Sequence, residues 1–134
     1  MILIANYSLR MISFDERALK LAKVAQQKTV VIYADKTGNE PFTEWLEGLR
    51  DQQGRRRILR RLRRIEQGNF GDCKFLHDGV YELRLFFGPG YRVYFGQDDN
   101  NIVVLLCSGD KNSQDEDIKL ARSYWKEYKS REKV

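Results

Sequence analysis

The chain has 134 residues, of which 42% are hydrophobic and 32% charged, and its net charge is +5. A chain of this length is typical of one domain and buries enough surface to fold without a disulfide or a metal. The positive charge favours an anionic partner such as nucleic acid. There is no apolar run of ~18 residues that would span a membrane. The opening MILIANYSLR is too short and too polar for a secretory signal, so we expect a cytoplasmic protein with no membrane partner.

The two cysteines, Cys73 and Cys107, lie far apart in the sequence, and neither has a metal ligand at CxxC spacing. Their pattern predicts two reduced thiols and no metal site. Cys107 ends the run IVVLLC and is expected to be buried in a strand. No cofactor is expected.

Residues 1–28 are predicted to form an N-terminal extension ahead of a main domain at 29–134. Ser13 followed by Glu16 fits a capping box. Apolar residues then recur at helical spacing, which predicts a helix over about 14–27. For residues 1–11 three alternatives stay open: a strand, a disordered head, or upstream sequence before a start at Met11.

The next segments alternate between strand and helix patterns. The run TVVIYA at 29–34 is rich in β-branched residues and predicts a strand. Pro41 suits the first turn of a helix, and residues 52–54 are expected to end that helix. A second helix is predicted over 55–68.

The second helix is unusually rich in arginine. Its apolar stripe consists of Ile58, Leu59, Leu62 and Ile65, and seven arginines occur within ten residues. Such a density of like charge costs stability unless a polyanion compensates, and arginine favours bidentate phosphate contacts. We therefore expect a surface that binds a phosphate backbone, formed by Arg56, Arg57, Arg60, Arg61, Arg63 and Arg64. A solvated helix face and a docking site for an acidic protein are the alternatives.

Residues 79–95, GVYELRLFFGPGYRVYF, contain two strand-like runs around the turn signal Gly88-Pro89-Gly90. A three-residue loop there predicts a hairpin that pairs Leu85 with Val93. Side chains of a strand alternate between faces. One predicted face is apolar and belongs on a core: Tyr81, Leu83, Leu85, Phe87, Tyr91, Val93 and Phe95.

The opposite face of this hairpin is expected to carry Glu82, Arg84, Phe86, Arg92 and Tyr94. In the predicted register Arg84 lies opposite Tyr94 and diagonal to Arg92, roughly 7–8 Å away. Two arginines this close repel each other unless an anion lies between them, and a phosphate is the obvious candidate.

The remaining segments complete an α+β pattern. A strand is predicted from Cys73 to Leu76, a central strand over 102–107, and a final helix over about 114–129. The last three strands are expected to form an antiparallel meander with two helices packed on one face.

The chain resembles the RelE/ParE superfamily of toxins from type II toxin–antitoxin systems, and within it the HigB-like "addiction module killer" branch. The segments that carry the resemblance are FTEWLEGLRD, RRRILRRLRRIEQGNFGDCKF, GVYELRLFFGPGYRVYF and LLCSGDKNSQDEDIKLA, which span about residues 42–121. The resemblance implies a RelE-like fold, with a C-terminal helix and here an extra N-terminal helix. It also implies a cytoplasmic bacterial or archaeal toxin, neutralised by a cognate antitoxin that is expected to be of the helix-turn-helix type.

Many members of the superfamily cleave mRNA on the ribosome without a metal, and the resemblance implies the residues that do so here. Arg92 matches the arginine that stabilises the transition state. Lys74, Arg84 and Lys111 match basic positions of the family's site. Glu82 is an alternative base on the same face as Arg84, Asp72 is a more distant candidate, and the general acid stays unassigned. Tyr94 shares this face and is expected to stack on a base.

The resemblance leaves two other functions open. A ParE-like minority of the superfamily inhibits DNA gyrase and cuts no RNA. A decayed toxin that only binds its antitoxin is the third possibility.

Overall fold

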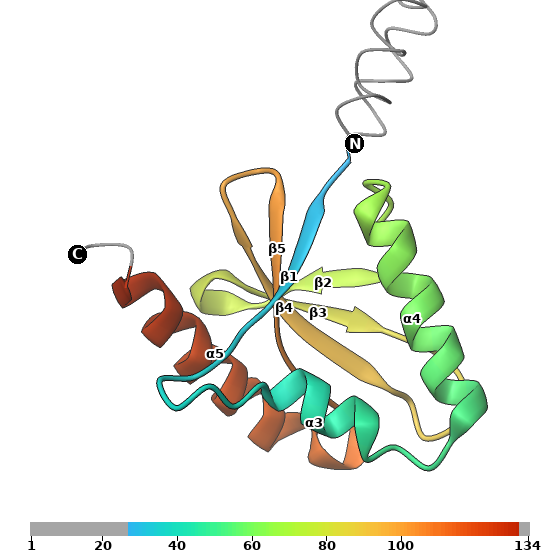
Figure 1. The fold of residues 1–134 in the computed structure, drawn as a ribbon. Helices are drawn as coiled ribbons and strands as arrows, with labels where there is room; N and C mark the ends of the chain where they lie inside the picture. The colour runs from blue at the N-terminus through green and yellow to red at the C-terminus, as the bar shows by residue number, and fades with distance from the viewer. Residues whose placement is uncertain (1–26, 132–134) are drawn as a thin grey trace, which may run out of the picture.

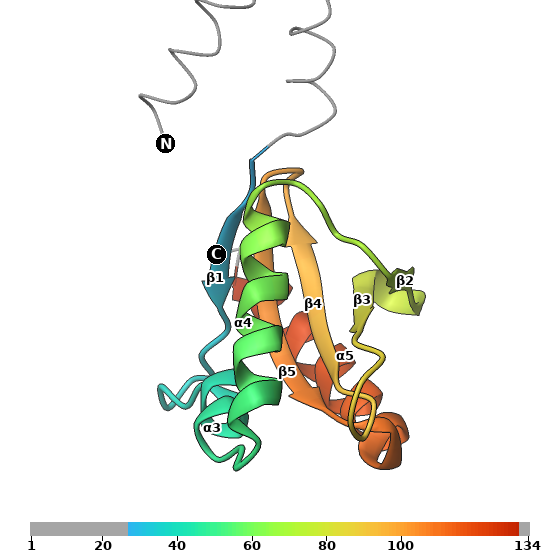
Figure 2. The same cartoon turned by 90° about the vertical axis from the view of Figure 1, so that its right-hand side faces the viewer.

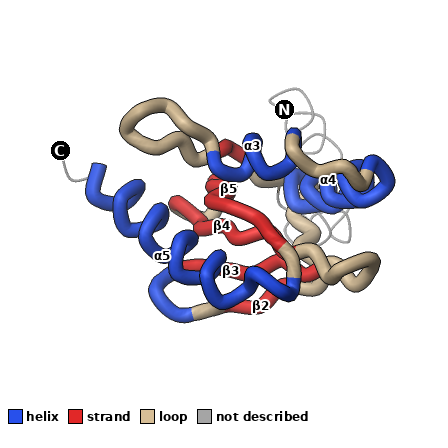
Figure 3. Tube along the Cα trace, turned by 90° about the horizontal axis from the view of Figure 1, so that it is seen from below, coloured by secondary structure: helices blue, strands red, loops and turns tan. Residues whose placement is uncertain are grey.

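The computed structural model describes residues 27–131, and the helix predicted at about 14–27 falls outside them. The described chain forms three layers, in which a central sheet is covered by helices on both faces (Figure 3). Helices α3 and α4 lie on one face, and α5 lies on the other. This is the α+β architecture expected of a RelE-like fold.

The elements follow one another along the chain as Figure 1 shows. In order they are β1 (Thr29–Ile32), α3 (Pro41–Glu47), α4 (Gln52–Glu66), β2 (Cys73–Phe75), the 3₁₀ turn η1 (His77–Gly79), β3 (Val80–Arg84), β4 (Arg92–Asp98), β5 (Ile102–Gly109), the 3₁₀ turn η2 (Lys111–Ser113) and α5 (Gln114–Arg131).

The five strands form one sheet in the order β1-β5-β4-β3-β2. Strands β3 to β5 form the expected antiparallel meander of three strands, and β2 adds a fourth antiparallel strand at its edge. Strand β1 adds to β5 in parallel, a pairing that the sequence did not reveal. Strand β5 is buried over most of its length, as its continuous apolar run predicted.

Helix α4 packs three residues of its predicted apolar stripe on the sheet, with Ile58, Leu62 and Ile65 buried, whereas the fourth, Leu59, is 42% exposed. It begins three residues earlier than predicted, because Asp51 caps it by accepting a hydrogen bond from the backbone N–H of Gly54 at 2.9 Å. The break between α3 and α4 therefore lies at 48–51 and not at 52–54. Figure 2 shows α4 running alongside the sheet.

Helix α5 covers the opposite face of the sheet through Ala121 and Trp125, which join a second buried cluster. Gly96 of β4 makes this packing possible, because a Cβ there would collide with the indole ring of Trp125. The Tyr128 hydroxyl also donates to Asp98 Oδ2 at 2.8 Å. A helix thus lies over part of the sheet face on which the polar side chains of the hairpin were expected.

The register of the β3–β4 hairpin differs from the prediction by two residues. Arg84 pairs with Arg92, and Leu83 pairs with Val93. The backbone N–H of Leu85 donates to the carbonyl of Tyr91 at 3.0 Å, so the loop has five residues, 86–90, instead of three. A shift by two leaves the side chains that stay in the strands on their predicted faces, because strand side chains alternate with a period of two, but it moves Phe86 and Phe87 into the loop.

Candidate nucleic-acid interface and cleavage site

The strand register places the expected catalytic residues in two neighbouring rows on the face of the sheet that α5 partly covers. Lys74, Glu82 and Tyr94 form one row across β2, β3 and β4. Arg84 and Arg92 lie directly opposite each other in the next row. Directly opposed residues of an antiparallel pair approach more closely than diagonal ones, and opposed like charges destabilise a sheet. We call these five residues, together with Lys111, the arginine face.

Glu82 lies at the centre of the arginine face and is only 2% exposed. Its Oε2 accepts hydrogen bonds from the Tyr94 hydroxyl at 3.1 Å and from Gln114 Nε2 at 2.8 Å. Arg92 Nε lies 3.7 Å from the same oxygen. These contacts hold the carboxylate in place beside Arg92, which favours a role for Glu82 in positioning Arg92 over one in accepting a proton.

The two arginines are anchored separately. Arg92 donates from Nη1 to the carbonyl of Gly90 at 2.7 Å. Arg84 donates from Nη2 to Asp72 Oδ1 at 3.0 Å, and this hydrogen bond raises the pKa of Arg84. Each guanidinium therefore has its own carboxylate neighbour, so the structure can hold two positive charges side by side.

The two lysines lie on either side of the arginine pair, and both are exposed. Lys74 lies opposite Glu82 on the edge strand β2. Lys111 begins η2, just after β5, and its backbone N–H lies 3.4 Å from the carbonyl of Pro89 in the hairpin loop. The fold thus brings Glu82, Arg84 and Arg92 together and leaves the lysines at the borders of the arginine face.

Tyr94 is placed differently from what the sequence suggested. Its side chain is fully buried in the cluster beneath α5. Burial, followed by the charge of Glu82, raises the pKa of Tyr94 well above its usual range. A fully buried ring cannot stack on a base. Tyr94 therefore cannot make the nucleic-acid contact that was expected of it.

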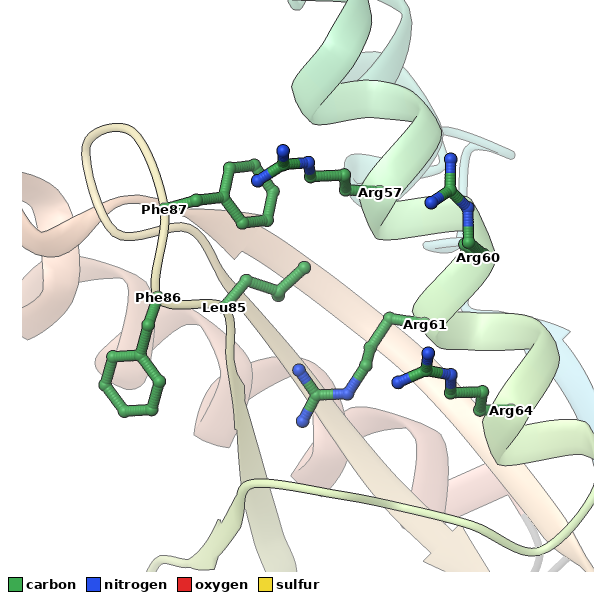
Figure 4. Close-up of a pocket in the computed structure, with 7 residues that line it drawn as sticks. All are labelled: Arg57, Arg60, Arg61, Arg64, Leu85, Phe86 and Phe87. Atoms are coloured by element: carbon green, nitrogen blue, oxygen red, sulfur yellow. The ribbon is translucent and has the colours of Figure 1, made fainter.

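A second basic feature lies between α4 and the loop that follows β3. Figure 4 shows arginines of α4 facing the start of this loop. We call this pocket of about 310 Å³ the arginine groove, and its lining residues are Arg57, Arg60, Arg61, Arg64, Leu85, Phe86 and Phe87. The guanidinium of Arg57 lies 4.6 Å from the centroid of the Phe87 ring. Of the six arginines expected to bind a phosphate backbone, four thus line one groove, and Arg56 and Arg63 are exposed outside it.

Arg61 differs from the other arginines of the groove because its side chain is bonded to the domain itself. Its Nη1 donates to the carbonyl of Arg84 at 2.8 Å. Its Nη2 donates to the carbonyls of Asp72 at 2.9 Å and Phe70 at 3.2 Å. Burial lowers the pKa of Arg61. This residue therefore joins α4 to the segment before β2 and to the end of β3.

Sequence reasoning missed two features of the site. Phe86 was expected beside Arg92 on the hairpin face, but it lies in the five-residue loop and is 78% exposed. Asp72 was considered only as a distant candidate base, yet it contacts Arg84 through its carboxylate and Arg61 through its carbonyl. The only sequence signal for this anchor was the position of Asp72, immediately before the strand that carries Lys74.

Within residues 27–131, no helix is both long and apolar enough to cross a membrane. Over the same residues, no group of three or more His, Cys, Asp or Glu side chains is placed to hold a metal ion.

Comparison with known proteins identifies the family. Residues 44–126 match the family model "Phage derived protein Gp49-like (DUF891)". The chain is also similar to an uncharacterized protein of Haemophilus influenzae (strain ATCC 51907 / DSM 11121 / KW20 / Rd), with 46% identity over 81 residues. That alignment covers 60% of this chain and 82% of the relative. The matched region contains α4, the hairpin and most of α5, and the chain therefore belongs to the Gp49-like family of RelE-like toxins from toxin–antitoxin systems.

Proposed function

We propose that this toxin is a ribosome-dependent mRNA endoribonuclease of the HigB-like branch, which cleaves without a metal and so inhibits translation. The observation that carries the proposal is the pair Arg84 and Arg92, directly opposite each other on adjacent strands. Two arginines that emerge opposite each other from one sheet face make a site for a group with more than one negative charge, and a phosphate that gains charge in a transition state is such a group.

The proposed reaction uses the RNA's own 2′-hydroxyl as the nucleophile. The 2′-oxygen forms a bond to the adjacent phosphorus, the bond from phosphorus to the 5′-oxygen breaks, and a 2′,3′-cyclic phosphate results. The hydroxyl proton goes to a base, and a proton is delivered to the leaving 5′-oxygen. Arg92 and Arg84 stabilise the pentavalent phosphate, which carries an additional negative charge relative to the ground state.

The proton carriers are proposed among the exposed lysines. Lys74 and Lys111 border the arginine face on opposite sides, so one can accept the 2′-hydroxyl proton while the other serves the leaving oxygen. Glu82 holds Arg92 in position for the phosphate.

The partners follow from this assignment. The mRNA is the substrate, and the exposed arginines of α4 contact RNA of the ribosome or of the message. A co-encoded antitoxin, proposed to be of the helix-turn-helix type, neutralises the toxin. The division into an extension at 1–28 and a toxin domain at 29–134 stays a prediction.

Primer extension on mRNA in a reconstituted translation system tests the proposal. The wild-type protein should create new 5′ ends that require ribosomes, and Arg92→Ala should abolish them. Arg50→Ala is the matched control, because Arg50 is an exposed arginine in the loop between α3 and α4. Thermal melts of both variants verify that each is folded.

The rival function gives the opposite result. If no new ends appear with folded wild-type protein, the nuclease proposal is wrong. If the double variant Arg92→Ala, Lys111→Ala also stays toxic in cells, ParE-like inhibition of DNA gyrase replaces the nuclease proposal. If the wild type is not toxic, the protein is a remnant that binds only its antitoxin.

A further inference from the structure

Phe86 is the most exposed large apolar side chain among the described residues, at 78%. Burying a phenylalanine side chain stabilises a protein, and the fold does not obtain that stabilisation from Phe86. Phe86 stands on the loop after β3 and is one of the residues that line the arginine groove, but its ring points away from the arginines of α4 (Figure 4). The ring is therefore available to a partner that extends out of the groove over this loop.

The opposite wall of the groove is cationic. Arg57, Arg60 and Arg64 are exposed and fall at the i, i+3 and i+7 positions of α4, which lie on one side of a helix. A rise of 1.5 Å per residue spreads them over roughly 10 Å along the helix axis. The seven lining residues are four arginines and three apolar residues, so none of the described side chains that line the groove is acidic.

Arg84 connects this groove to the arginine face. Its guanidinium carbon lies 5.5 Å from the centroid of the Phe86 ring, while its strand position is directly opposite Arg92. A ligand that follows the groove past Phe86 therefore reaches the arginine pair. An extended polymer with a flat ring and a negative charge in each unit fits this arrangement.

We infer that the arginine groove binds a segment of single-stranded RNA, in which an unpaired base stacks on Phe86 and the phosphates contact Arg57, Arg60 and Arg64. The inference rests on the proposed function and deepens it, because it assigns the base platform that Tyr94 cannot provide. Aromatic platforms combined with a positively charged groove are the general solution for binding single strands. An acidic protein segment would use the arginines but would have no need of an exposed flat ring.

Binding of a fluorescent oligouridylate to the full chain at low salt tests the inference. Phe86→Ala should weaken binding by about 5- to 150-fold, the loss expected when one stacked base loses its aromatic platform. Phe86→Trp should bind at least as tightly as the wild type. Phe75→Ala is the matched control, because Phe75 is also exposed, at 58%, but lies on β2 outside the groove.

An abasic strand of the same length separates stacking from a general defect. It carries the same phosphates but no bases, so the wild type and Phe86→Ala should bind it equally. Arg60→Ala should weaken binding to both strands. Phe86→Ala removes a side chain that packs on little of the domain, and its melting temperature should stay close to that of the wild type.

Either of two binding results overturns the inference. One is a folded wild type that does not bind the oligouridylate at low salt, and the other is a Phe86→Ala variant that binds as tightly as the wild type. Neither result depends on cleavage, which the Arg92→Ala comparison reports separately. Binding that requires Phe86 without ribosome-dependent cleavage would refute the nuclease proposal alone.

A photoreactive phenylalanine analogue at position 86 identifies the source of the strand. On ribosomes that carry mRNA, a crosslink to the message or to ribosomal RNA supports the inference and distinguishes the two. Crosslinks to proteins alone would contradict it and would favour an acidic protein as the occupant of the groove.

Discussion

Arg61 is expected to stabilise the fold, whereas its neighbour Arg60 is expected to serve binding. The perturbation is Arg61→Met, which keeps an apolar stem on α4 but removes all donors. Three carbonyls then lose a charged partner, at donor–acceptor distances of 2.8, 2.9 and 3.2 Å. Hydrogen bonds to charged groups contribute about 1.5–3 kcal/mol each. In the variant, water that enters the open groove can form hydrogen bonds with some of these carbonyls. We therefore expect the free energy of unfolding to fall by about 2–4 kcal/mol.

Urea unfolding followed by circular dichroism measures this loss as a lower midpoint at an unchanged slope. Arg60→Ala is the matched control, because Arg60 is exposed on the same helix, and its change should stay within about 0.5 kcal/mol. A similar small change for Arg61→Met, or an equal loss in both variants, would refute the reasoning that the three carbonyl contacts distinguish Arg61.

Three further predictions concern packing, acid stability and thiol reactivity. Gly96→Ala should lower the melting temperature sharply, because the added Cβ collides with Trp125, and an unchanged melt would contradict the packing of α5. The hydrogen bond from Gly54 lowers the pKa of Asp51, so its stabilisation is present above the unfolded pKa of ~3.9 and is lost as the pH falls through the folded pKa. Urea titrations at acid and neutral pH should show this loss, and Asp51→Ala should reduce the difference. Burial raises the pKa of Cys107 to about 12, so a thiol reagent at pH 8 should modify it only after unfolding, and rapid modification of the native protein would disprove its burial.

The local sequence determined those helices and strands whose apolar residues mark a buried side. The 3.6-residue period of Ile58, Leu62 and Ile65 predicted the buried side of α4, and the unbroken apolar run after Asn101 predicted β5. The two faces of the hairpin were also correct, although the register was not. Alternation of side chains depends on the strand itself, and a shift by two residues preserves it.

The tertiary structure alone decided which polar residues are accessible. Tyr94 and Glu82 have the strand spacing of surface residues, but the packing of α5 buries both and pairs them with each other. Which helix covers which face depends on contacts between residues distant in sequence, such as Gly96 with Trp125.

The composition of α4 determined that this helix is strongly basic, but only the fold separated its arginines by role. Arg61 and Arg60 are adjacent and chemically identical, yet one contacts the carbonyls of three distant residues and the other stays exposed. In the same way, the five-residue loop turned Phe86 away from its expected place beside Arg92 and exposed it at the arginine groove. Sequence spacing fixes the direction of a side chain within its own element, whereas its partners depend on how the elements pack together.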